Sequence, residues 1–184
     1  MDEFEFLFTF YGLLLGLALV NVATGLADLW RGREDIRVGI CGPALALAIG
    51  SFAVSQWYLA WANRAALTVG PWQLLVCVGV TLPVVFVSQG MFPKQTDKWD
   101  TLDDYYLAHC GVLLTALSIS PLVSVLSNWF LFRGSVTVAD ILRIAFTIAL
   151  PLGMIWWRNR WAHAAMLGLV TAFYLFTRLF RFIS

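Results

Sequence analysis

Apolar residues along the chain fall into six long stretches, and most charged residues lie between them. The apolar runs are continuous rather than alternating, which favours helices over the strands of a membrane β-barrel. Each run has about the 20 residues that a helix needs to cross a bilayer. The predicted spans are 4–29, 38–62, 72–91, 105–132, 138–157 and 161–183. The pattern predicts an all-α polytopic membrane protein: one domain, a six-helix transmembrane bundle, with both termini on the same side.

The longest polar segment, 92–104, separates the third span from the fourth. Pro93 follows the third span, where a helix commonly stops. Thr101 has the character of an N-cap, and Asp104 follows it three residues later, as in a capping box. The fourth helix is therefore predicted to begin near Leu102.

Small residues at four-residue spacing predict where helices approach closely. The first span contains Gly12 and Gly16, and the second contains the pairs Ala44/Ala48 and Ala46/Gly50. These spans are predicted to form the tightest pair in the chain, although the same spacing also occurs in dimer motifs.

Composition excludes several classes of protein. The 184 residues are 60% hydrophobic and only 12% charged, more apolar surface than a soluble domain of this size can bury. A net charge of +1 gives no general attraction to nucleic acid. The expected partner is the lipid bilayer, with a homo-oligomer or a larger membrane complex as a further expectation.

Basic residues suggest an orientation. Arg31, Arg33 and Arg37 follow the first span, and none precedes it. Because cytoplasmic loops are enriched in Lys and Arg, the loops after the first, third and fifth spans are predicted to be cytoplasmic. Both termini are then expected on the outer side, which is the periplasm in a bacterial inner membrane.

Three prolines lie at mid-depth in their spans, and each leaves the carbonyl four residues earlier without its helical partner. Freed carbonyls and nearby hydroxyls can line a path for ions or small polar ligands, and they can equally belong to plain kinks. No Asp, Glu, Lys or Arg lies at that depth, which disfavours a proton-coupled carrier. The candidate path residues are Pro83, Pro121, Pro151, Ser118, Ser120, Thr147 and Asn21, with Gln89 as an extension.

His109 and His163 are the only histidines, and chain direction places them at the same depth. Two facing imidazoles could ligate a haem iron, a metal or a quinone head group. The alternative is two interfacial histidines that hydrogen-bond separately. Three cysteines without a C-x-x-C pattern are interpreted as small buried apolar residues.

An acidic loop is the third candidate site. Asp97, Asp100, Asp103 and Asp104 have a spacing that could bind Mg²⁺ and a diphosphate. Six-span phosphotransferases use such a pattern, but the Gly and Ala-Arg that follow it there are missing here. The other interpretation is that these acids favour the positive N-terminal end of the fourth helix.

Two segments resemble an uncharacterised family of bacterial multi-pass inner-membrane proteins. They are FYGLLLGLA in the first span and FP…W-x-x-LDDYY-x-x-H before and within the fourth. The resemblance implies a bacterial plasma-membrane protein and transfers no functional residue.

The leading functional hypothesis is a non-catalytic integral membrane protein without a cofactor, either channel-like or transporter-like, or a membrane subunit of a larger assembly. The chain lacks the common catalytic motifs. The alternative is a haem-binding or quinone-binding redox protein that uses His109 and His163. The third is an intramembrane enzyme acting on a phosphate-bearing lipid.

Overall fold

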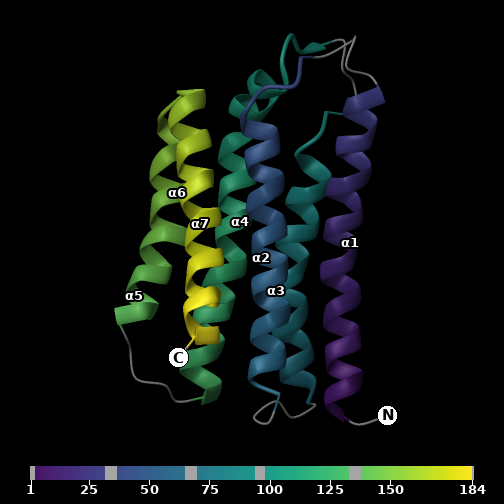
Figure 1. The fold of residues 1–184 in the computed structure, drawn as a ribbon, viewed down its shortest axis with the longest axis vertical. Helices are drawn as coiled ribbons and strands as arrows, with labels where there is room; N and C mark the ends of the chain where they lie inside the picture. Colours follow the sequence, from purple (N-terminus) through teal and green to yellow (C-terminus); the bar gives the residue numbers. More distant parts are fainter. Residues whose placement is uncertain (1–2, 32–36, 65–69, 94–97, 133–137, 184) are drawn as a thin grey trace.

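The computed structural model describes residues 3–31, 37–64, 70–93, 98–132 and 138–183. Almost all of them are helical (Figure 1). The long helices are α1 (Glu3–Arg31), α2 (Cys41–Ala62), α3 (Pro71–Gly90), α4 (Leu102–Phe132) and α7 (Arg160–Ile183). Within the described ranges the extended pairing is limited to one isolated bridge, between Arg37 and Thr101. The all-α prediction is therefore confirmed, and the helices coincide with the predicted spans to within a few residues.

The fifth predicted span is one rod built from four short pieces. These are α5 (Val138–Ile144), the π-helix η2 (Ala145–Ala149), α6 (Leu150–Gly153) and the 3₁₀-helix η3 (Met154–Trp156). Pro151 explains the π-helical turn, because its ring displaces the carbonyl of Thr147 and it offers no N–H to bond with. The mid-depth proline thus changes the winding of this helix.

Four of the described helices are long and apolar enough to cross a membrane. The spanning segments are Phe4–Arg31, Cys41–Ala62, Pro71–Gly90 and Leu102–Ser127. The fifth rod is divided by its π-turn, and α7 begins with a more polar turn that contains Arg160 and His163. The four apolar helices support an integral membrane protein.

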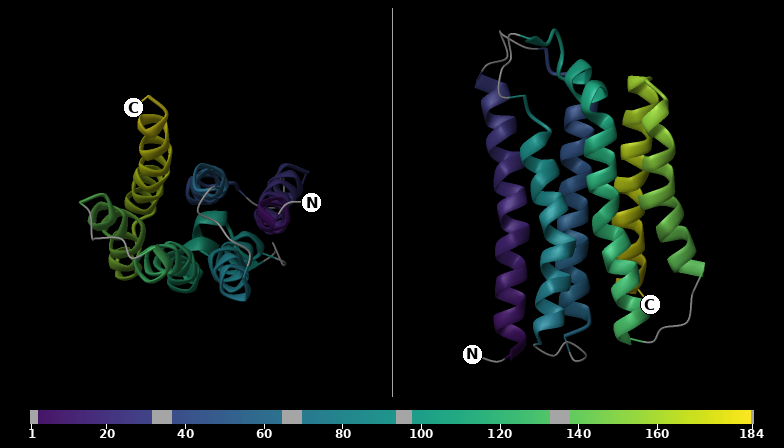
Figure 2. Two further views of the ribbon diagram at one scale, coloured as in Figure 1. Left: turned by 90° about the horizontal axis from the view of Figure 1, so that it is seen from below. Right: turned by 180° about the vertical axis from the view of Figure 1, so that it is seen from behind.

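The rods run side by side, and α1 begins at the same end of the molecule at which α7 ends (Figures 1 and 2). The opposite end is called the upper end here, as drawn in Figure 1: α1 and α3 end there, and α2, α4 and α7 begin there. The most extensive packing joins α1 to α3, α3 to α4 and α2 to α7.

The prediction that the first two spans form the tightest pair is wrong, because α1 packs more extensively on α3 than on α2. A Cβ on Gly16 or Gly50 would meet open space, and one on Gly12 would lie 3.5 Å from the Trp57 ring. Small residues permit a close approach between helices but do not enforce one.

The core joins all the long helices, whereas large apolar side chains also cover the outward surface. Leu13, Phe130 and Trp156 are 71%, 78% and 86% exposed. Such a surface suits contact with lipid. Representative core residues, one from each long helix, are Leu15, Leu45, Val84, Leu114 and Leu167.

Candidate functional site

The predicted mid-depth hydroxyls bond mainly within their own helices. The Ser118 hydroxyl donates to the carbonyl of Leu114 at 2.8 Å, and the Thr147 hydroxyl donates to the carbonyl of Arg143 at 2.7 Å. Such bonds satisfy a hydroxyl in an apolar environment without a ligand. These two contacts fit the interpretation of the prolines as kinks.

Two other path residues differ from this pattern. The Asn21 side chain donates to the Ser88 hydroxyl at 3.1 Å and so joins α1 to α3. Ser120 is fully buried beside Pro121, and its hydroxyl has no hydrogen-bond partner among the described residues. Pro83 is half-buried, whereas Pro121 and Pro151 are buried. Among these path residues Asn21 has a hydrogen bond to another helix, whereas Ser118 and Thr147 bond within their own helices.

His163 lies fully buried near the start of α7 at the upper end. Its Nε2 lies 2.6 Å from the carbonyl oxygen of Trp157, and its Nδ1 lies 3.1 Å from the Tyr106 hydroxyl. A carbonyl can only accept, so in the neutral ring Nε2 carries the proton and Nδ1 accepts the Tyr106 O–H. Both ring nitrogens are therefore already bonded, and a metal or haem iron would have to displace one of these partners.

Two cysteines lie near this pair and are buried, as the sequence suggests. The Cys41 thiol donates to the carbonyl of Arg160 at 3.4 Å, and the Cys110 thiol lies 4.0 Å from the carbonyl oxygen of Ile155. Cys77 is half-buried, and all three cysteines are free. Cys41 thus joins the start of α2 to the start of α7, and Cys110 joins α4 to η3.

Asp103 is a buried carboxylate that serves a neighbouring helix. Its two oxygens accept the backbone N–H groups of Ile40 at 3.2 Å and Cys41 at 2.8 Å, where α2 begins. A Cβ on Gly39 would overlap this carboxylate. The negative charge thus satisfies unpaired N–H groups and the positive end of the α2 dipole.

Thr101 and Asp104 form the predicted cap of α4. The Asp104 N–H donates to the Thr101 hydroxyl oxygen at 3.1 Å, and that hydroxyl donates to the Asp104 carboxylate at 2.6 Å. Asp100 is exposed, and Asp97 lies outside the described residues. Across the described ranges, no group of three or more His, Cys, Asp or Glu could hold a metal ion. Two of the predicted acids therefore cap helices.

His109 lies on a different face of α4 from the residue that meets His163. Its Nδ1 lies 2.9 Å from the carbonyl oxygen of Tyr105, and its ring lies 4.5 Å from the Tyr105 ring. Tyr106, which contacts His163, follows Tyr105 in the sequence, so its side chain is rotated by about 100° around α4 relative to that of Tyr105. The two histidines share the upper end but contact different residues.

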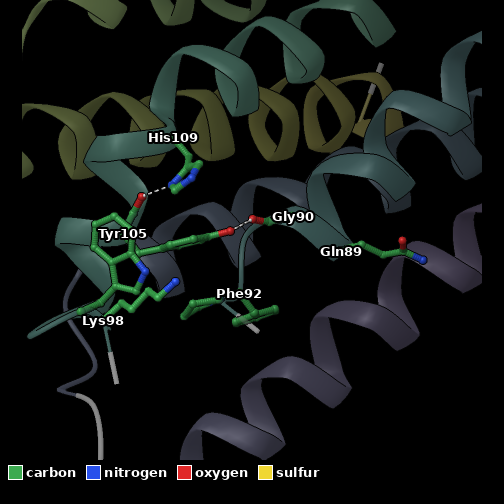
Figure 3. Close-up of a pocket in the computed structure, with 8 residues that line it drawn as sticks. Gln89, Gly90, Phe92, Lys98, Tyr105 and His109 are labelled. Carbon is green, nitrogen blue, oxygen red and sulfur yellow. Dashed lines mark hydrogen bonds between the residues drawn. The ribbon is translucent and has the colours of Figure 1, made fainter. Parts of the chain in front are cut away.

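An open pocket of about 460 Å³ lies between the end of α3 and the start of α4 (Figure 3). The Tyr105 hydroxyl donates to the carbonyl of Gly90 at 2.8 Å and so joins the two helices across it. The ring of Trp99 packs edge-on against Tyr105 and His109, at 5.4 and 5.7 Å between centroids. The residues that line it are Gln89, Gly90, Phe92, Pro93, Lys98, Trp99, Tyr105 and His109.

Comparison of the chain with protein-family models, with curated proteins and with solved structures finds no match. The resemblance to bacterial inner-membrane proteins therefore stays a prediction.

Sequence reasoning selected only two of the lining residues, His109 and Gln89. It missed the contribution of Lys98, Trp99 and Tyr105, because the pocket forms only when the end of α3 meets the start of α4. One signal was available: Tyr105 and His109 are four residues apart, which places both side chains on one helix face.

Proposed function

We propose that this chain is a non-catalytic integral membrane protein that binds the polar head of an amphipathic molecule in the pocket at its upper end. The observation that carries the proposal is the pocket itself. It combines three aromatic rings, a lysine and a histidine at one end of apolar helices. Trp and Tyr favour the membrane interface, where one side of a ligand is apolar and the other is wet.

The exposed surface below the pocket provides room for an apolar tail. Phe86 is 55% exposed and lies one turn deeper along α3 than Gly90. Val112 is 58% exposed and lies about one turn deeper along α4 than His109. The two helices that meet at the pocket pack on each other, and each carries an exposed apolar side chain about one turn deeper. These side chains are available to contact the tail of a ligand whose head lies in the pocket.

The lining residues favour binding over catalysis. Among the described residues around the pocket there is no Ser, Cys, Asp or Glu that could serve as a nucleophile or a partner for His109. The Tyr105 hydroxyl already donates its proton to Gly90. Binding of this kind suits a transporter-like protein, or a membrane subunit of a larger or homo-oligomeric assembly.

The proposal includes six spans in a bacterial inner membrane, with both termini in the periplasm. The rod 138–156 and α7 are the fifth and sixth spans. Their exposed apolar side chains include Ile141, Leu142, Leu169 and Leu175, as a lipid-facing surface requires. The pocket then lies at the cytoplasmic side.

The test is lipid retention in the purified full-length protein. We expect native mass spectrometry to show a bound amphiphile that the variant Trp99→Ala loses, because the ring that packs against Tyr105 and His109 is removed. Trp156→Ala is the matched control, since Trp156 is 86% exposed and does not line the pocket. Equal retention in wild type and Trp99→Ala would contradict the proposal.

A further inference from the structure

We infer that the pocket selects a phospholipid head that carries a phosphodiester and a separate hydroxyl, as a phosphoglycerol head does. This inference rests on the proposed function and names its ligand class. Three features lead to it: the free nitrogen of His109, the charge of Lys98, and the position of the Tyr105 side chain relative to both.

His109 presents a hydrogen-bond acceptor to the pocket. Its Nδ1 faces the carbonyl oxygen of Tyr105, so in the neutral ring the proton is on Nδ1 and Nε2 has a free lone pair. Nε2 makes no hydrogen bond with the residues that the structure describes. A ligand group that meets it must therefore donate a proton, as a hydroxyl does and an ionised phosphodiester does not.

Lys98 is the charged residue among the described residues that line the pocket, and no carboxylate accompanies it there. Its ammonium can donate to a phosphodiester, and the net charge of the lining favours an anion. Near a membrane surface, such a lysine is also attracted electrostatically by the anionic lipid of the leaflet. Lys98 is thus the natural contact for the phosphate.

The two contacts require two kinds of group, an anion at Lys98 and a hydrogen-bond donor at Nε2 of His109. In the view of Figure 3, His109 and Lys98 lie on opposite sides of the Tyr105 side chain, whose hydroxyl is held by Gly90. A ligand that meets both carries an anion and a separate donor group. A phosphoglycerol head has this form, because its phosphodiester is the anion and its glycerol hydroxyls are donors.

Other common phospholipid head groups satisfy only one of the two contacts, at Lys98 or at His109. A phosphodiester with a plain alkyl group, as in phosphatidylethanol, satisfies Lys98 and leaves Nε2 of His109 without a donor. An ethanolamine head offers a donor, but its ammonium brings a second cation into a pocket to which Lys98 already contributes one. Phosphatidylglycerol satisfies both the charge and the donor.

The experiment compares three lipids with identical acyl chains on the purified full-length protein in mixed micelles. They are phosphatidylglycerol, phosphatidylethanol and phosphatidylethanolamine, and retention is read by native mass spectrometry. We expect wild type to retain phosphatidylglycerol about fivefold better than either of the others, which corresponds to one net hydrogen bond or charge contact.

Two variants separate the two contacts. His109→Phe keeps a ring beside Tyr105 and removes the acceptor, so it should lose the preference over phosphatidylethanol and keep the preference over phosphatidylethanolamine. Lys98→Gln should do the reverse. Lys98→Arg keeps the cation and should therefore keep the preference over phosphatidylethanolamine that Lys98→Gln loses. Arg64→Gln removes an exposed cation at the other end of α2 and is the control expected to behave as wild type.

The outcomes distinguish the inference from the proposed function. Equal retention of the three lipids overturns the inference and leaves amphiphile binding intact. If the wild-type protein retains none of the three lipids, although its thermal unfolding shows that it is still folded, both the inference and the proposed function are overturned. Glycerol phosphate without acyl chains is added as competitor; if it displaces phosphatidylglycerol at equal concentration, the lipid assignment is wrong and the ligand is a soluble phosphate ester.

Discussion

Two consecutive tyrosines divide the upper end of the molecule into two unlike regions. Tyr106 points into a closed corner that also contains Asp103, Cys41 and His163, all buried. Tyr105 points into the open pocket with His109, Trp99 and Lys98. Both regions have a Tyr–His contact, and one turn of α4 supplies both tyrosines.

The difference lies in which polar groups remain unpaired. In the closed corner each ring nitrogen of His163 and each oxygen of Asp103 has a partner from the protein itself. In the open pocket His109 uses one nitrogen internally and leaves the second available. A fully paired buried network gives stability and leaves no room for a ligand, whereas an incompletely paired and accessible one gives binding.

The largest effect is expected from Asp103→Ala. The change leaves the N–H groups of Ile40 and Cys41 without their carboxylate at the start of α2. Loss of hydrogen bonds to a buried charged group should lower the free energy of unfolding by about 3 kcal/mol. Chemical unfolding in detergent measures this, with Asp100→Ala as the exposed control. An equal change in both variants would show that the buried carboxylate of Asp103 contributes no more to stability than the exposed carboxylate of Asp100.

A smaller effect is expected from Tyr106→Phe. The substitution keeps the ring and removes the donor to Nδ1 of His163, which is then buried without a partner. The free energy of unfolding should fall by about 1 to 2 kcal/mol, and lipid retention should not change. The adjacent Tyr105→Phe provides the comparison, since its hydroxyl lies at the pocket. Loss of bound lipid in Tyr106→Phe would show that the corner is part of the binding site.

The smallest effect on stability is expected from His109→Ala. This side chain is exposed and bonds only to its own helix, so the free energy of unfolding should stay within about 0.5 kcal/mol of wild type. The matched variant is His163→Ala, which removes a fully buried ring and two hydrogen bonds. If the two substitutions destabilise the protein equally, the contrast between the two regions does not hold.

The sequence predicts the helices and the cap of α4 well, because these depend on neighbouring residues. Thr101 and Asp104 are three residues apart, and their reciprocal bonds form as the spacing indicates. At Pro151 the sequence predicts a freed carbonyl or a kink, and it does not predict the π-helical turn Ala145–Ala149. The proline identifies the position of the disturbance, but the surrounding packing decides how the helix winds.

The partners of Asp103 and His163 could not be predicted from spacing. Asp103 bonds to a backbone N–H 62 residues away, and His163 meets a tyrosine 57 residues away. The rotation of α4 relative to α7 decides whether Tyr105 or Tyr106 contacts His163. An apolar helix without a clear polar face does not encode that rotation in its pattern.

The contact between Asp103 and α2 also has a consequence for biogenesis. The first N–H groups of α2 find their carboxylate in a segment that the ribosome makes 62 residues later. At about 5 to 20 residues per second, that delay is roughly 3 to 12 s. During this interval α2 has an uncapped start, and the upper end can close only once α4 has emerged. Assembly of this end of the molecule is therefore a late event in synthesis, because the start of α2 is capped only after Asp103 has been made.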